Sequence, residues 1–478
     1  MQATTPKDKK YVVINIGSSS ITGMLSIKHP GGLVQPIAMS RQPSRDNVKR
    51  GYIHNIDGTA KSIGLIIDEL SAQLEENEKI SSVYVGLECV SMRSRVYRSQ
   101  LTLPHGGEIV SHEHLQTLRD QVQDADYGKD EVVRVLHPRF FVDGKPEMKP
   151  QGVRCQRIDA VYQVITARKN ILENLRTTFE QKLALEINDI LITPVAEATT
   201  ILSSQEAMLG CVYVNIGGGC TSVSLYKDRL LSGLYVLPMG GRDVTKDLES
   251  LSLVESYAEQ VKLTKAAMSL EVDRNEAINI EGVSIKQIDI NRTVMARMVE
   301  IMLNVINIVS EASAGEQSNI ASWVLTGGAT QLMGFVESIE GQIGQPVRVG
   351  GIRPEFVSGA VSEAERASYV SELALTHLAS KDCIELVYQA MDILTQDPVE
   401  EDVLDANLED LPIGSDEPDQ SLEIAAGLAD NGPTQAVPSV EQRTKAPSRG
   451  SGFWGSVKKG FMGMIDKING EDEDEYED

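Results

Sequence analysis

Two short stretches of this sequence share one plan: an apolar strand, a turn of small residues and a second alternating strand. The first is YVVINIGSSSITGMLSI at residues 11–27, the second is VYVNIGGGCTSVSLY at residues 212–226, and each has Asn-Ile-Gly at its turn. A single glycine turn favours an ordinary β-hairpin. Two copies predict a duplicated fold with two facing turns, and the backbone N–H groups of such turns suit phosphate oxygens.

Length, charge and cysteine usage narrow the class of protein. The chain has 478 residues, 41% of them hydrophobic, which is enough for about two to four domains. Its formal charge of −24 argues against a nucleic-acid partner, and the sequence contains no Walker-type G-x-x-x-x-G-K-[ST] motif. Five cysteines without a C-x-x-C pair fit a reducing cytosol, and no histidine or cysteine spacing predicts a zinc site.

The amino-terminal residues pass from positive charges directly into a strand, which is unlike a signal peptide. Uninterrupted apolar runs stay short of the ~20 residues that span a bilayer. We therefore expect neither a secretory signal nor a transmembrane helix.

Predicted strands and helices alternate along the chain, as in α/β proteins. Residues 91–168 instead carry short alternating strands around one polar helix, which predicts an inserted α+β subdomain. Beyond about residue 395 the composition is that of an acidic, disordered linker. Amphipathic or apolar spacing predicts helices over residues 62–74, 170–185, 195–208 and 293–311.

A third glycine turn lies in WVLTGGATQLMGF, residues 323–335, where a strand leads into a Gly-Gly turn and a helix start. In this order the three turns resemble the phosphate 1, phosphate 2 and adenosine motifs of the actin, Hsp70 and sugar-kinase superfamily. Within it the chain resembles the FtsA family of bacterial cell-division proteins. Four further stretches carry that match: LITPVAEATTILSSQEAMLG, LPMGGRDVTKDL, EQVKLTKA and HPRFFVDGKPEMKPQGVRCQRIDAVYQVITA.

The resemblance covers about residues 12–379 and the last helix, and it implies a two-lobed actin-like ATPase fold with ATP and Mg²⁺ in the cleft. It also implies actin-like polymerisation and tethering of the FtsZ ring to the cytoplasmic face of the inner membrane at the division septum. Later division proteins would bind residues 91–168. The implied domains are 10–90 with 169–200 (first lobe), 91–168 (insertion), 201–240 with 315–395 (second lobe), 241–314 (helical subdomain, implied to recruit FtsZ), 396–450 (linker), 451–470 (membrane helix) and 471–478 (acidic tail).

The resemblance also assigns the nucleotide-binding residues. They come from the three turns and from a helix that offers lysines: Asn15, Gly17, Ser18, Ser19, Ser20, Asn215, Gly217, Gly218, Gly219, Cys220, Thr221, Lys262, Lys265, Gly327, Gly328 and Ala329.

Three of the positions where the superfamily commonly has carboxylates are neutral here, namely Asn15, Asn215 and Ser222. Carboxylates hold Mg²⁺ well because a hard cation prefers charged oxygens. An amide oxygen accepts hydrogen bonds from metal-bound water but carries no charge. We therefore expect ATP binding with water-mediated Mg²⁺ at the two asparagines, no direct metal ligand, and weak or absent hydrolysis. Gln205 and Glu206 are candidates for activating a water, although an ordinary solvated helix end explains them equally well.

The segment GFWGSVKKGFMGMIDKING, residues 452–470, has the pattern of an amphipathic helix. With anionic lipid as partner it would lie in a membrane interface, and the alternative is a helix docked in a protein groove. Gly455, Gly460 and Gly463 weaken the helix in water, so we expect it to fold on binding. The predicted membrane contacts are Phe453, Trp454, Val457, Lys458, Lys459, Phe461, Met464, Ile465 and Ile468.

Two rival functions remain from the sequence. A true kinase or ATPase of the same superfamily would need the missing carboxylates as base and metal ligands. A pilus-assembly ATPase shares the core, but the long linker and terminal amphipathic helix argue against it.

Overall fold

The computed structural model describes residues 9–29, 31–104, 106–273, 276–313, 320–358, 361–386 and 451–470. The predicted linker, the acidic tail and the basic residues Arg443, Lys445 and Arg449 lie outside these ranges.

Two five-stranded sheets carry the same strand order. In each, a central strand pairs antiparallel with the strand that follows its glycine turn, and parallel with a later strand on its other side. The duplicated α/β fold predicted from the two Asn-Ile-Gly stretches is confirmed. The first sheet runs β15 (Glu186–Ile192), β7 (Ser82–Leu87), β1 (Lys10–Ile16), β2 (Ser20–Lys28) and β3 (Val34–Pro43); the second runs β22 (Val347–Val349), β21 (Ser322–Thr326), β16 (Cys211–Ile216), β17 (Thr221–Lys227) and β18 (Leu230–Leu237).

Helices cover the first sheet through apolar stripes. α1 (Ile56–Ser71) buries Ile63, Ile66 and Leu70, which recur at helical spacing, and Asn55 caps its first turn by accepting a hydrogen bond from the Gly58 N–H at 3.0 Å. The short hairpin β4 (Val48–Lys49) and β5 (Tyr52–Ile53) precedes this helix.

Two predicted helices of this lobe are interrupted. The one over residues 170–185 consists of α3 (Lys169–Arg176) followed by a π-helical turn, Thr177–Lys182. The one over residues 195–208 divides into α4 (Thr193–Ile201) and α5 (Ser204–Leu209). The reason is a capping box, because Ser203 and Glu206 bond each other's backbone N–H groups and start a new helix.

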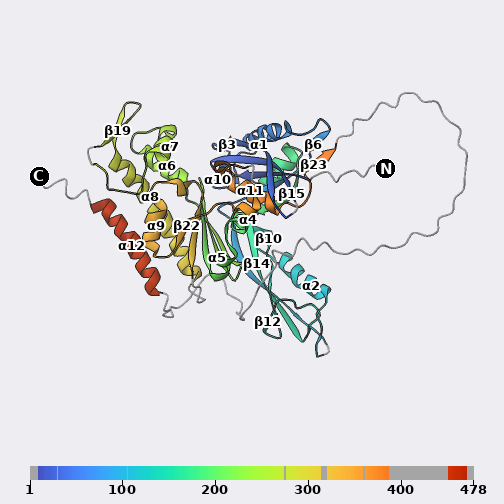
Figure 1. The fold of residues 1–478 in the computed structure, drawn as a ribbon. Coiled ribbons are helices and arrows are strands. Elements are labelled where there is room, and N and C mark those ends of the chain that lie inside the picture. The colour runs from blue at the N-terminus through green and yellow to red at the C-terminus, as the bar shows by residue number, and fades with distance from the viewer. Residues whose placement is uncertain are drawn as a thin grey trace, which may run out of the picture.

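The insertion forms a sheet around one long strand, β14 (Arg157–Arg168), and projects from the first lobe in Figure 1. Helix α2 (His112–Gln123) buries Leu118 and Val122 in a separate apolar cluster with this sheet. The other strands are β8 (Arg93–Thr102), β10 (Asp130–Val135), β11 (Arg139–Val142) and β12 (Lys145–Glu147), with β9 (Glu108–Ile109) pairing β13 (Arg154–Cys155) beside them.

The second lobe is covered by helices built around α8 (Gln287–Ala312), which begins six residues before its predicted start. By length and composition α8 could cross a membrane, but it buries Val294, Met298, Ile301 and Val305 in this lobe's core. Helix α6 (Gly241–Glu249) and strand β20 (Val283–Lys286) pack on α8, and β20 forms a hairpin with β19 (Ala277–Ile280). Helix α7 (Glu255–Thr264) packs on α6, and α9 (Phe335–Ile343) packs on β22.

Two expectations about the carboxy-terminal part of the core are wrong. The Gly-Gly turn leads into a 3₁₀ turn, Gly328–Gln331, so helix α9 begins only at Phe335 rather than beside the turn. The predicted second lobe extended to residue 395, but α11 (Val370–Leu378) packs on α4 and β1. Its buried Leu373 and Leu375 join the core of the first lobe. After α10 (Glu363–Ser368) and α11, strand β23 (Ile384–Leu386) pairs with β6 (Glu78–Ile80), also in that lobe.

Candidate functional site

The two predicted turns have the same local geometry. The Gly17 N–H donates to the Ser20 carbonyl oxygen at 3.1 Å, and the Gly217 N–H donates to the Cys220 carbonyl oxygen at 3.0 Å. Each turn therefore closes on itself at its first glycine and leaves the amides of the two following residues for other contacts.

The turns approach each other directly across the lobes. A Cβ atom at Gly218 would lie 1.9 Å from Ser19 Oγ, and one at Gly219 would lie 2.5 Å from Ser18 Oγ. A side chain at either glycine would collide with the facing turn, so the bare backbone allows this approach.

A cavity of about 220 Å³ lies at this junction. Eleven of the predicted nucleotide-binding residues line it: Asn15, Gly17, Ser18, Ser19, Ser20, Asn215, Gly217, Gly218, Gly219, Cys220 and Gly328. Five others do not, namely Thr221, Lys262, Lys265, Gly327 and Ala329.

The two lysines are placed differently from one another. Lys262 Nζ donates to Glu259 at 2.6 Å, to Thr245 Oγ1 at 2.8 Å and to the Gly241 carbonyl at 3.0 Å. Lys265 follows the end of α7 and is exposed. Reaching a phosphate would require Lys262 to exchange these partners.

Three carboxyl groups that sequence reasoning missed surround the two asparagines: Glu197 and Glu372 are buried, and Glu88 is partly buried. The Asn215 Nδ2 atom donates to Glu88 Oε2 at 3.3 Å and to Glu197 Oε2 at 3.2 Å. Glu197 also accepts from Tyr213 Oη and Ser371 Oγ, each at 2.6 Å. The third carboxylate is that of Glu372 on α11, and it accepts a hydrogen bond from Thr22 Oγ1 of the first lobe.

Burial disfavours the charged form of all three groups. It raises the pKa of Glu88 to about 8, with a further contribution from the neighbouring Glu197 carboxylate. Burial likewise raises the pKa of Glu197 to about 7 and raises that of Glu372.

The floor of the cavity, formed by Asn15, Asn215 and Glu88, retains polar atoms that could bond a ligand. Glu88 Oε1 and Ser222 Oγ are both buried, and neither meets the geometry of a hydrogen bond within the described part of the chain. The Ser222 hydroxyl nevertheless lies near the Glu88 carboxyl group and partly offsets the rise in its pKa. Asn15, by contrast, is already engaged, because its Oδ1 accepts from Thr193 Oγ1 at 3.1 Å. Among the described residues no group of three or more His, Cys, Asp or Glu side chains is arranged to hold a metal by itself.

Glu206 and Gln205 lie away from this cavity. The Glu206 carboxylate forms a two-point ion pair with Arg348, at 2.6 and 2.9 Å, and caps α5 through Ser203. The hydrogen bonds from Arg348 hold its pKa at about 2. Gln205 is exposed on the same short helix, so neither side chain is brought to the cavity as a water-activating group.

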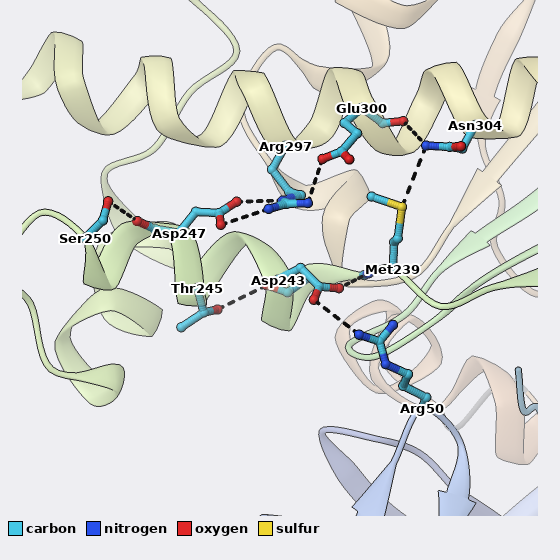
Figure 2. Close-up of polar contacts among 11 residues, drawn as sticks. Arg50, Met239, Asp243, Thr245, Asp247, Ser250, Arg297, Glu300 and Asn304 are labelled. Carbon is cyan, nitrogen blue, oxygen red and sulfur yellow. Dashed lines mark hydrogen bonds and ion pairs between the residues drawn. The ribbon is translucent and has the colours of Figure 1, made fainter.

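Arginines join the two lobes beside the turns. Arg50 of the first lobe pairs with Asp243 of α6 at 3.9 Å (Figure 2). Arg242 donates from Nη1 to the carbonyls of Ser18 and Arg45, at 3.2 and 3.1 Å. The lobes are therefore linked by polar contacts as well as by the facing turns.

A second polar network lies on the helical part of the second lobe. Figure 2 shows Arg297 of α8 between two acidic residues: it forms a two-point pair with Asp247, at 2.6 and 2.9 Å, and a third contact with Glu300 at 2.6 Å. Asp247 and Arg297 line a surface depression, and the exposed Lys246 lines it as well.

The carboxy-terminal helix α12 (Ser451–Gly470) packs along α8 and α9 (Figure 1). Val457, Phe461 and Ile468 are 3%, 0% and 4% exposed and join the second lobe's core. The Trp454 ring meets the buried Trp323 ring edge-on at 6.4 Å. In this structure the predicted apolar face is in a protein groove. Met464 and Ile465 are partly buried there, Phe453 and Lys459 are exposed, and Lys458 is half-buried.

Two equivalent sheets whose glycine turns face each other over a polar cavity define the two-lobed actin-like ATPase fold. A type IV pilus biogenesis complex, PilM–PilN, has a similar fold, with a TM-score of 0.52 at 15% identity over 77% of this chain and 96% of that one. This likeness concerns the fold alone.

Sequence comparisons define the family. The family model described as "Cell division protein FtsA" matches residues 212–373. The cell division protein FtsA of Porphyromonas gingivalis is 36% identical over 79% of this chain and 80% of its own length. That of Pseudomonas aeruginosa is 27% identical over 78% and 90%. The chain belongs to the FtsA family of cell-division proteins, as its motifs predicted.

Proposed function

We propose that this chain binds ATP with Mg²⁺ in its cleft, polymerises in an actin-like way and tethers the FtsZ ring to the cytoplasmic face of the inner membrane at the septum. The observation that carries the nucleotide part is the pair of facing turns over one polar cavity. Membership of a cell-division family supports the rest.

The phosphates would be bound by backbone amides of both turns, with hydroxyl groups of Ser18 and Ser19 beside them. A ligand pocket usually measures about 300–1,000 Å³, whereas this cavity holds about 220 Å³. ATP would therefore bind with the lobes further apart, and Arg50 and Arg242 would oppose that opening. Such coupling makes the angle between the lobes responsive to nucleotide.

The cavity floor suits a hard cation better than the sequence indicated. Bound Mg²⁺ would neutralise phosphate charge and orient its waters. Glu88 offers an unpartnered oxygen, while Asn15 and Asn215 would hydrogen-bond metal-bound water.

An ATP-hydrolysing enzyme is the second candidate function, favoured by the two carboxyl groups near Asn215. With pKa values of about 8 for Glu88 and about 7 for Glu197, either group is suited to exchange a proton near neutral pH. A single-turnover assay with ATP and Mg²⁺ separates this candidate from a slow or non-hydrolysing switch.

Membrane attachment would use α12 once its apolar face is free. Lys458, Lys459 and Lys467 flank that face and would be attracted to anionic lipid. One such helix gives reversible binding, so stable attachment needs several copies in a polymer.

FtsZ binding would reside in residues 241–314. An acidic tail of FtsZ would meet basic positions of this segment such as Lys262 and Arg297, and both already contact acidic side chains. The exposed Lys246 adds positive charge on the same surface, so we expect binding that weakens as salt rises. The Lys246→Glu variant should weaken FtsZ binding, and Lys145→Glu in the insertion is its control. Equal binding by both variants would contradict this assignment. Residues 91–168 would serve later division proteins.

Co-sedimentation with anionic liposomes, with and without ATP and FtsZ, tests the tether. Replacing Trp454 and Phe461 with Glu should abolish liposome binding, because a charge in the interface removes the apolar driving force. Glu at Ser456 and Met462, which are exposed in the docked helix, is the control and adds the same charge. Binding that persisted in the first double variant would contradict the membrane assignment.

A further inference from the structure

Glu88 occupies a position that the duplication makes informative. In the first lobe Asn15 pairs with Gly86 of β7, and Glu88 lies two residues further on; in the second lobe Asn215 pairs with Thr326 of β21, and Gly328 lies two residues further on. Glu88 and Gly328 are therefore structural equivalents at the carboxyl ends of β7 and β21, and both line the cavity. Only the first lobe has a carboxylate there.

The contacts of Glu88 leave part of its capacity unused. Its Oε2 atom accepts one hydrogen bond, from Asn215, and the same amide group also serves Glu197. Its Oε1 atom is buried and has no partner among the described residues. A buried carboxylate oxygen in this state is costly unless a ligand or proton reaches it.

Positive charge on the described lining of the cavity comes from one residue, Arg41. Arg41 donates to the Ser368 carbonyl at 2.7 Å, and its guanidinium stacks over the Tyr369 ring at 5.2 Å. It is engaged on the α10–α11 side, so it does not neutralise Glu88.

We propose that Glu88 supplies the carboxylate that holds nucleotide-bound Mg²⁺ in this chain, in place of the carboxylates absent at Asn15 and Asn215. Mg²⁺ in nucleotide sites commonly takes one or two carboxylates together with phosphates and water. One protein carboxylate would then be enough, which agrees with the absence, among the described residues, of three or more side chains arranged to hold a metal by themselves. The inference rests on the proposed binding of ATP.

The experiment compares ATP affinity in Mg²⁺ and in EDTA by calorimetry, for the wild type, Glu88→Gln, Glu88→Asp and Glu206→Gln. Glu88→Gln should lose about ten-fold or more of the Mg²⁺-dependent gain in affinity, while its affinity in EDTA is kept. Glu88→Asp should retain part of the gain, and Glu206→Gln all of it. Mn²⁺ bound with ATP, followed by electron paramagnetic resonance, gives a second readout.

A full Mg²⁺ gain in folded Glu88→Gln would overturn the role of Glu88 while leaving ATP binding intact. A wild type that binds ATP in neither condition would overturn the nucleotide proposal and the metal role together.

A different observation, the docking of α12, carries a second inference. The side chains buried against α8 and α9 are the same ones that a membrane interface would take, including Val457, Phe461 and Ile468. One apolar face cannot contact the groove and lipid at once. The docked and membrane-bound states therefore exclude each other.

At Gly460 the backbone of α12 passes close to Gln342 of α9. A Cβ atom there would lie 2.4 Å from Gln342 Oε1 and 3.9 Å from the Gln342 carbonyl oxygen, on α9. At Gly463, three residues on, a Cβ atom would meet nothing within 4 Å. A Cβ atom alone could be accommodated by rotation of the flexible Gln342 side chain, so the test needs a long side chain, which at Gly460 must also find room between α12 and α9. The same residue at Gly463 would meet open space at its Cβ.

We infer that the groove between α8 and α9 holds the apolar face of α12 away from lipid until the helix is released. The device rests on the proposed membrane role of α12. It also explains how a helix with five glycines can be ordered without a bilayer, because the groove replaces the lipid as its apolar partner.

The test pairs Gly460→Gln with Gly463→Gln, which change composition and helix propensity equally. Hydrogen exchange should show a less protected α12 in Gly460→Gln only. Sedimentation with phosphatidylglycerol vesicles should show several-fold more of that variant bound than of the wild type or Gly463→Gln.

A released α12 that binds vesicles no better than Gly463→Gln would overturn the inference, and so would an α12 in Gly460→Gln as protected as in the wild type. If none of these proteins binds vesicles, the proposed membrane role of α12 is overturned, and with it the inference that docking in the groove regulates that role. If binding persists in the Trp454, Phe461 double variant, another surface binds lipid.

Discussion

The cleft between the lobes and the groove beneath α12 bury their side chains in opposite ways. The cleft brings Glu88 and Glu197 within hydrogen-bonding distance of one amide group and leaves Glu88 Oε1 without a partner in the described chain. The groove buries Phe461 completely among apolar neighbours. A region with unused polar capacity is suited to an outside ligand, whereas a region filled by its own chain is stable until that segment leaves.

The largest expected effect comes from adding a carboxylate to the cleft floor. Asn215→Asp replaces the amide that donates to Glu88 and Glu197 at 3.2–3.3 Å, so a third acid would meet two others. An unpaired buried charge costs about 3–5 kcal/mol, and we expect the free energy of unfolding to fall accordingly in EDTA. Thermal melting measures the loss, and ATP with Mg²⁺ should recover more stability in this variant than in the wild type.

The same substitution at an exposed site is the control. Asn279→Asp lies on the β19–β20 hairpin, where the side chain accepts one backbone hydrogen bond at 3.0 Å. It should melt close to the wild type. An Asn215→Asp protein as stable as this control in EDTA would show that the cleft floor tolerates charge, and the contrast with the groove would disappear.

The next largest effect concerns the groove. Phe461→Ala removes a side chain that is 0% exposed, and such truncations cost about 3–5 kcal/mol in a core. Because α12 is a terminal element, the loss should appear mainly as local release of the helix, with little change in global melting. Hydrogen exchange of residues 453–469 measures the release, and Met462→Ala, at a 50% exposed position, is the control. Global unfolding at a much lower temperature would mean that α12 is integral to the core.

The parts predicted correctly from sequence are those with local signals. The turns at Gly17 and Gly217 each lie between two alternating strands, so a hairpin signal, repeated once, was enough to predict both lobes. The resemblance to the FtsA family then gave the order of the elements.

The acidic floor of the cleft had no such signal. Glu88 directly follows β7, Glu197 lies in α4 and Glu372 lies in α11. These elements are far apart in the sequence, and only the tertiary fold brings the three carboxyl groups together. The docking of α12 was equally hidden, because a groove and a membrane select the same helical pattern. Glu206 could have been assigned correctly, since Ser203 three residues earlier forms the S-x-x-E pattern of a capping box.

The smallest expected effect is at Glu206, a carboxylate whose oxygens, unlike those of Glu88, are all used. Arg348 and Ser203 hold its pKa at about 2, below the ordinary 4.5, so the unfolded chain binds the proton more readily. The contact therefore stabilises the fold above about pH 4.5, and this contribution is lost as the pH falls toward 2. Since Arg348 is 40% exposed, we expect only about 1 kcal/mol from the pair. Urea unfolding of Glu206→Gln should show that deficit at pH 5 to 7 and a shrinking one below pH 4, with Glu113→Gln, in the first turn of α2, as a control. A deficit that is the same at every pH would mean that Glu206 acts through its shape and capping bonds, and not through its charge.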